Sequence, residues 1–131
     1  MMKSAISIFV VIAAFSFSVK SQDLCIKLKN ARIIAQDSEN TYLGTVSNKH
    51  SSESIFNEYG KFGSEFRTTS IWNEHSSFGS KHRIYSAFND HSNKPPKIVK
   101  NGYTIGYLTT NKFKIKAINP FELKGQCKDK F

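Results

Sequence analysis

The chain reads SIFNEYGKFGSEF over residues 54–66 and SIWNEHSSFGSKH over residues 70–82. A third and shorter copy, SAFNDH, occupies residues 86–91, and the pair Lys49-His50 before the first copy is echoed by Lys81-His82 before the third. The copies keep a period of 16 residues, which indicates one structural unit used several times in succession. This period is the main basis for predicting the fold.

Each copy opens with a serine, an aliphatic residue and an aromatic residue, followed by an asparagine and an acid. The serines can cap a helical turn, and the asparagines suit the left-handed position that ends one. Glycines later in each copy permit tight turns that a β-carbon would obstruct. We therefore expect residues 48–96 to form short helical turns joined by ordered loops, with a core made of Ile55, Phe56, Ile71, Trp72, Ala87 and Phe88.

The pattern resembles a family of bacterial exported or envelope-associated proteins with tandem Ser-Ile-Phe/Trp-Asn-x-Tyr-Gly-x-Tyr-Gly-Ser units. In that family the units are typically followed by Pro-Pro-x-Ile and Gly-Tyr-Leu-Thr-x-Asn, which are residues 95–98 and 106–111 here. The resemblance covers about Tyr42 to Asn111 and implies no activity, because the family has no assigned chemistry. His75-Ser76 and His91-Ser92 replace the Tyr-Gly of the family, so we expect looser turns there.

The flanks of the repeated segment carry strand patterns. Leu24 to Leu28 alternate apolar and polar residues, and residues 32–36 and 41–47 predict two further strands around the turn Asp37–Asn40. Farther along, Asn101-Gly102 between two short runs is a strong hairpin signal. The predicted fold is mainly β, with α+β as the alternative, and its small antiparallel sheet is built from both flanks.

The last part of the chain predicts one strand and one short helix. Phe113, Ile115 and Ala117 alternate with lysines, as in a half-buried strand. Asn119-Pro120 followed by Glu122 reads as a helix cap, a first-turn proline and a capping-box acid, and Gly125 is expected to end a single helical turn.

Residues 1–21 have the pattern of a signal peptide, with Lys3 before a short apolar run, and an uncleaved anchor helix is the alternative. Cleavage after Ser21, favoured over the alternative site after Ser18, would leave residues 22–131 as one domain. The only cysteines, Cys25 and Cys127, lie near its two ends. In an exported chain they predict a disulfide, and the alternative is a pair of free thiols. We expect the protein to be periplasmic or secreted.

The positive charge is unevenly distributed. Without residues 1–21 the formal charge is +7, and residues 94–131 hold nine lysines against two acids, whereas residues 51–93 hold four basic and five acidic residues. Such a tail suits an anionic surface, and the alternative is a merely solvated lysine-rich face. The predicted contact residues are Lys97, Lys100, Lys112, Lys114 and Lys116.

All four histidines (50, 75, 82 and 91) lie in the repeated segment. They occupy slots that hold Tyr59 or Phe66 in the first copy, which favours aromatic packing over metal binding or catalysis. A metal site and a cofactor are not predicted. We expect the aromatic side chains near the asparagines to pack in the core. If they were exposed, they would suit a platform that binds carbohydrate or single-stranded nucleic acid. The side chains in question are Tyr59, Phe62, Trp72, Phe78 and Tyr85.

The favoured function is a non-enzymatic exported module that binds an anionic envelope component or a protein partner, with nucleic acid not favoured. One alternative is a small secreted hydrolase or nuclease that uses His75, His82 and His91. The other is a periplasmic inhibitor or immunity protein.

Overall fold

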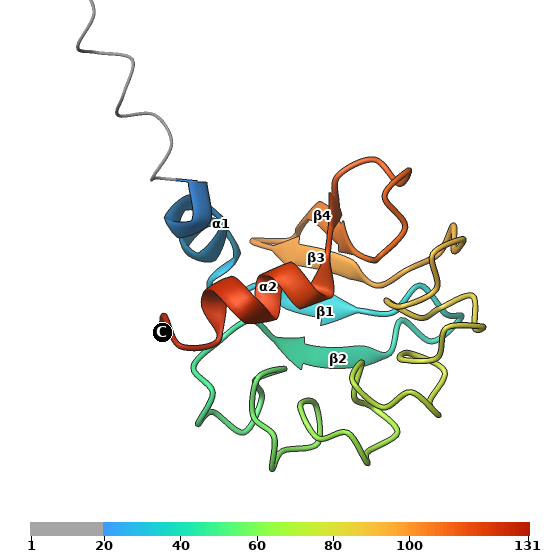
Figure 1. Cartoon of the computed structure of the whole chain (residues 1–131), viewed down its shortest axis with the longest axis horizontal. Coiled ribbons are helices and arrows are strands. Elements are labelled where there is room, and N and C mark those ends of the chain that lie inside the picture. The colour runs from blue at the N-terminus through green and yellow to red at the C-terminus, as the bar shows by residue number, and fades with distance from the viewer. Residues whose placement is uncertain (1–19) are drawn as a thin grey trace, which may run out of the picture.

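The computed structural model describes residues 20–131 and places side chains from Leu24 onward. The predicted leader, residues 1–21, lies outside the described residues apart from its last two, which begin the first helix. No helix in the described part of the chain is long and apolar enough to cross a membrane. In chain order (Figure 1) the elements are α1 (Lys20–Leu28), β1 (Arg32–Ile34), β2 (Tyr42–Thr45), β3 (Lys97–Lys100), β4 (Tyr103–Leu108), β5 (Ala117–Ile118) and α2 (Pro120–Cys127).

One five-stranded sheet holds both flanks of the chain together, in the order β2-β1-β3-β4-β5. Neighbouring strands are antiparallel except for β4 and β5, which are parallel. The central pair joins segments far apart in the sequence, with Arg32 opposite Val99 and Ile34 opposite Lys97. The prediction of a mainly β fold with one sheet from both flanks is confirmed, and the single parallel pair makes that sheet mixed.

Both predicted turns of the flanks are present. Asn101 and Gly102 connect β3 to β4 with φ angles of 53° and 83°, and a two-residue hairpin turn of this kind needs two left-handed residues. In the other turn, Asn40 has a φ of 49°, and the Asp37 carboxylate accepts hydrogen bonds from the backbone N–H and the hydroxyl of Thr41 at 2.9 and 2.5 Å.

The strand predicted at Leu24–Leu28 is wrong, because these residues end helix α1. Alternation would bury Ile26 together with Leu24 and Leu28, but Ile26 is 69% exposed. A helix instead brings Cys25 and Leu28 to one face, and both are buried. Cys25 forms a disulfide with Cys127 of α2, with the two Cα atoms 5.4 Å apart, so α1 packs beside α2.

The strand predicted at Phe113–Ala117 is also wrong over most of its length. Only Ala117 and the residue after it pair with β4, while Phe113 and Ile115 are 86% and 79% exposed. Asn111 explains the difference, because its side-chain oxygen accepts the Phe113 N–H and its carbonyl accepts the Lys114 N–H, which closes a turn.

Helix α2 begins as predicted and ends later than predicted. The Asn119 side chain accepts the N–H groups of Phe121 and Glu122, and Pro120 occupies the first helical position. The helix does not end at Gly125 but continues to Cys127, and Gly125 lies in the helix with open space around it.

The core is shared by the sheet, both helices and the repeated segment. The six residues expected to face inward all contribute to it: Ile55, Ile71 and Ala87 have no exposed surface, Phe56 is 4% exposed, and Trp72 and Phe88 are partly buried against the same cluster. Other core members come from the flanks and include Leu28, Ile33, Leu43, Ile98, Leu108 and Leu123.

Residues 48–94, called the turn segment below, wind in successive small loops around one side of the sheet (Figure 1). Most loops are single turns closed by a backbone hydrogen bond between residues three apart, as from Asn57 N–H to the Ser54 carbonyl at 3.2 Å. The hydroxyls of Ser54, Ser70 and Ser86 accept the N–H two residues farther on, at 2.9, 3.1 and 2.9 Å. The serines therefore cap turns that do not continue into helices.

The asparagines of the turn segment do not adopt the left-handed conformation that was predicted, since none of them has a positive φ. Asn57, Asn73 and Asn89 each make the same two side-chain hydrogen bonds. The Oδ1 atom accepts the N–H two residues on, and the Nδ2 group donates to the carbonyl six residues back, at 3.0 Å in all six cases. Each asparagine thus ties three successive turns together.

The looser turn expected at Ser76 is not observed. Ser76 is 6% exposed, and its hydroxyl accepts the N–H groups of Phe78 and Gly79 at 3.2 and 3.1 Å. A serine at this position therefore satisfies backbone groups that Gly60, its counterpart 16 residues earlier, cannot reach.

Candidate functional site

A group of cationic residues lies where α1, β1 and the β3–β4 hairpin meet. A hollow of about 350 Å³ there is lined by three cationic side chains, Lys29, Arg32 and Lys100, and by Ile26, Asn30, Val99, Asn101 and Gly102. No acidic residue lines it among the described side chains. We call this site the cationic hollow.

Local geometry explains how Lys29 and Arg32 reach the hollow. Helix α1 ends at Leu28, and Asn30 takes a left-handed φ of 66° that turns the chain into β1. Its N–H donates to the Val46 carbonyl at 2.7 Å, and Ala31 is fully buried, so the turn is held against the core. Two cationic residues from one short connection therefore line the same hollow, and the Lys29 ammonium also lies 6.0 Å from the centre of the Phe131 ring.

Lys100 enters the hollow from the sheet. Its ammonium group donates to the carbonyl oxygens of Lys27 at 2.9 Å and Ile26 at 3.5 Å, at the C-terminal end of α1. Unpaired carbonyls at a helix C-terminus attract a cation, so this contact both ends the helix favourably and holds Lys100 in place.

The positive charge continues along the open face of the sheet. Residues paired across strands project to the same side, so Arg32 shares a face with Val99, and Lys97 shares it with Tyr107. The Lys114 ammonium lies 4.5 Å from the centre of the Tyr107 ring, which adds a third cation to this face.

The five lysines predicted as contact residues do not form one surface. Lys97 and Lys114 share the sheet face, and Lys100 lines the cationic hollow. Lys112 lies over the exposed Phe113 ring at 5.8 Å, and Lys116 lines a different hollow over β4 and β5. The sequence prediction missed Lys29 and Arg32, because it counted charge only near the C-terminus.

No ion pair in the described part of the chain involves a cation of the hollow. The ion pairs among side chains from Leu24 onward are Lys49–Asp129 at 2.7 Å and His75–Glu74 at 3.6 Å. The hydrogen bond from Lys49 holds the pKa of the Asp129 carboxyl below its ordinary value. The cations of the hollow thus have no carboxylate partner in this region.

An acid does stand at the far edge of the sheet face. Tyr42 belongs to the edge strand β2, and its hydroxyl donates a hydrogen bond to Glu53 at 2.7 Å. Burial, and then the contact with Glu53, raises the pKa of Tyr42 from 10.0 to about 12. The Arg32 guanidinium lies 5.4 Å from the centre of the Tyr42 ring, so this tyrosine is the border between the cationic and the acidic parts of the face.

The histidines do not occupy packing positions, and that interpretation is wrong. All four are exposed, as are the residues that share their slots, Tyr59 at 96% and Phe66 at 87%. His50 and His75 line two separate hollows, and none of the described hollows is lined by more than one histidine. The described residues contain no group of histidine, cysteine and acid side chains with metal-binding geometry.

The remaining rings divide between core and surface. Phe62 is 4% exposed, while Trp72, Phe78 and Tyr85 are partly buried. Tyr59 is therefore the one ring of the suggested platform that is fully exposed, and Phe66, which was not included, joins it.

No protein-family model, curated protein or solved structure matches the chain.

Proposed function

We propose that the chain is an exported, non-enzymatic binding module that contacts an anionic component of the cell envelope through the cationic hollow and the adjoining sheet face. The observation that carries the proposal is that Lys29, Arg32 and Lys100 line one hollow and that no acidic residue among the described side chains lines it. Like charges held together repel one another, and an anion relieves that repulsion.

The chemistry of the three cations favours phosphate or carboxylate groups as the ligand. An arginine side chain offers a planar fork that matches either group, and lysine adds a compact charge. Lys97 and Lys114 extend the positive surface beyond one group, which suits a surface or polymer with repeated negative charges.

Export is part of the proposal and has separate support. The Cys25–Cys127 disulfide joins the two helices of the described domain, and disulfides persist in oxidising compartments. The leader pattern of residues 1–21 agrees with this placement.

The test compares two double variants that remove the same charge. Lys29→Gln with Arg32→Gln alters the cationic hollow, while Lys112→Gln with Lys116→Gln alters lysines outside it. The probes are phosphatidylglycerol vesicles, a carboxylated polysaccharide and DNA, with phosphatidylcholine vesicles as the uncharged control. Binding is measured by co-sedimentation or retention at increasing salt concentration.

We expect salt-sensitive binding to phosphatidylglycerol or the carboxylated polysaccharide, weakened about tenfold or more in the hollow variant and much less in the control variant. If both variants lost the same affinity, binding would depend on the net charge of the protein and not on the cationic hollow. Indifference to every anionic probe at low salt would refute the proposal, and a preference for DNA would move the partner to nucleic acid.

A further inference from the structure

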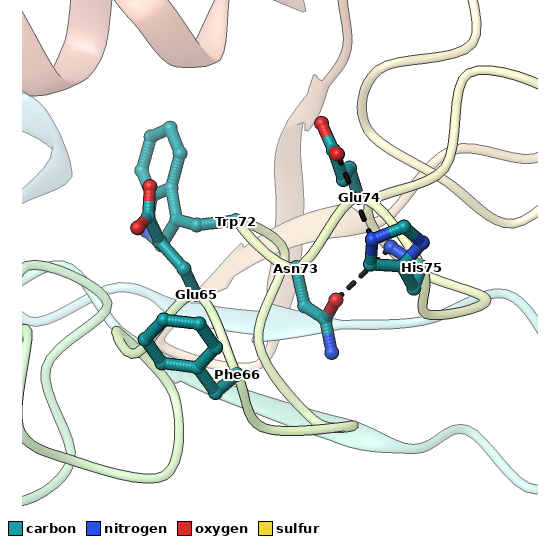
Figure 2. Close-up of a pocket in the computed structure, with 6 residues that line it drawn as sticks. All are labelled: Glu65, Phe66, Trp72, Asn73, Glu74 and His75. Carbon is teal, nitrogen blue, oxygen red and sulfur yellow. Dashed lines mark hydrogen bonds and ion pairs between the residues drawn. The ribbon is translucent and has the colours of Figure 1, made fainter.

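Two hollows on the turn segment are lined by residues at matching positions. The downstream hollow, of about 450 Å³, is lined by Glu65, Phe66, Trp72, Asn73, Glu74 and His75 (Figure 2). The upstream hollow, of about 240 Å³, is lined by Lys49, His50, Phe56, Asn57, Glu58 and Tyr59, together with two lysines of α2 and its C-terminus, Lys124 and Lys128. Each of the six downstream residues follows its upstream counterpart by 16 positions.

The same types of side chain recur in both hollows. Each has an exposed ring at the Tyr59 or His75 position, a second ring at the His50 or Phe66 position, and one carboxylate between them in sequence. Tyr59 is 96% exposed and Phe66 is 87% exposed. Exposed rings that line a hollow beside polar groups can contact a ligand.

Hydrogen bonds fix the backbone from which Tyr59 and His75 project. The Asn57 and Asn73 side chains accept the N–H groups of Tyr59 and His75 at 3.0 Å, and Figure 2 shows Asn73 directed at His75 in this way. The same amides donate to carbonyl oxygens six residues back, also at 3.0 Å. The asparagines are thus positioning residues, because they order the backbone on which Tyr59 and His75 stand before any ligand arrives.

The two hollows differ in the charge of their lining residues, and this difference limits the kind of ligand that could bind in both. Three lysines and Glu58 line the upstream hollow, whereas Glu65 and Glu74 line the downstream hollow. A strongly charged ligand would suit one of them and be repelled by the other. The features common to both are rings and a carboxylate acceptor, which suit an uncharged ligand with one apolar face and several hydroxyl donors.

We infer that the two hollows are equivalent subsites for a neutral saccharide. A sugar presents a face of C–H groups that packs on an aromatic ring, and its hydroxyls donate hydrogen bonds to carboxylates such as Glu58 and Glu74. Because the ligand is neutral and the surface is the turn segment, the inference goes beyond the anionic contact proposed for the cationic hollow and does not depend on it.

The single tryptophan provides a direct readout, because Trp72 lines the downstream hollow. The full chain is titrated with neutral oligosaccharides of glucose, of N-acetylglucosamine and of mannose, and Trp72 fluorescence and heat release are recorded. The test variant is Phe66→Ala with His75→Ala. The matched control is Tyr103→Ala with Phe113→Ala, which removes two rings that are 74% and 86% exposed and lie outside both hollows.

We expect a saturable change of Trp72 fluorescence with at least one oligosaccharide. The affinity that this signal reports should change little with salt, weaken about tenfold or more in the test variant and be retained in the control, while the heat release of the test variant keeps the contribution of the upstream hollow. Thermal unfolding of both variants should match that of the parent, since all four side chains are exposed. Absence of binding for all three sugars, or equal loss in both variants, overturns the inference. The Lys29→Gln, Arg32→Gln variant should bind the sugar normally, so failure of either proposal is distinguishable from failure of the other.

Discussion

Gly79 stands directly against the backbone of Asn73: a β-carbon placed on Gly79 would lie 2.2 Å from the Asn73 carbonyl oxygen. The same contact occurs 16 residues earlier, where a β-carbon on Gly63 would lie 2.1 Å from the Asn57 carbonyl oxygen. Neither glycine has a positive φ, so close approach rather than a left-handed backbone requires glycine here. The turn segment closes on itself at these two points.

We therefore expect Gly79→Ala to lower the free energy of unfolding by about 1 to 3 kcal/mol, because the backbone must shift to admit a methyl group. Chemical denaturation measures the change. Gly125→Ala is the control, since it adds a methyl group where nothing lies within 4 Å inside α2, and it should raise stability by about 0.5 to 1 kcal/mol. Equal effects at the two positions would contradict the close contact.

The paired hydrogen bonds of the asparagine predict the effect of a small chemical change. Asn73→Asp keeps the Oδ1 acceptor for the His75 N–H but replaces the Nδ2 donor with a second oxygen that faces the Arg67 carbonyl. Asn73 is 8% exposed, so the loss should cost about 1 to 3 kcal/mol of unfolding free energy. Asn93→Asp, at an exposed position, should be nearly neutral in the same denaturation experiment.

The disulfide links residues 102 positions apart and should contribute strongly to stability. In the chain-entropy model, a loop of this length corresponds to about 4 to 5 kcal/mol, because the cross-link restricts the unfolded chain. We expect Cys25→Ser with Cys127→Ser, or a reducing agent, to lower the melting temperature markedly. Reduction should leave the melting temperature of the double variant unchanged, and an unchanged parent under reduction would contradict the prediction.

Tyr42 should ionise at unusually high pH. Burial and the Glu53 contact raise its pKa from 10.0 to about 12, so the folded state holds the phenol proton more tightly than the unfolded state does. The resulting stabilisation is complete below pH 10 and is lost as the pH rises toward 12. Titration of tyrosine absorbance in the parent and in Tyr42→Phe isolates this one group.

Glu53→Gln separates the causes of this shift. It keeps an oxygen acceptor near the Tyr42 hydroxyl but removes the negative charge, so the midpoint should fall and still exceed the ordinary value because burial is the larger cause. A midpoint that does not move would show that the charge of Glu53 has no part in the shift.

Several local features were predictable from neighbouring residues alone. The Asn101-Gly102 hairpin, the Asp37–Asn40 turn and the Asn119 cap depend on backbone preferences and hydrogen bonds that span a few positions. The serine caps of the turn segment belong to the same class. The conformation of Asn57 and Asn73 was predicted wrongly, because their Nδ2 groups donate to carbonyl oxygens six residues back, which lie outside the four-residue turn that was considered.

The candidate sites were only partly predictable. Lys100 was predicted as a contact residue because it belongs to the lysine-rich C-terminal part of the chain. Lys29 and Arg32 lie beside it only because β1 pairs with β3, although the turn segment separates these strands in the sequence. We expected most aromatic side chains of the turn segment to lie in the core. Their order in the sequence does not indicate that Tyr59 and Phe66 are exposed while Phe62 is buried.

The sequence by itself determined the 16-residue period, the hairpin and the pair of cysteines, because each is encoded by side chains that act on their own backbone or by residue type alone. The tertiary structure decided that residues 24–28 form a helix, which rings are exposed and which cationic residues line one hollow. These outcomes depend on which surfaces are removed from water when distant segments pack together, and short-range patterns do not contain that information.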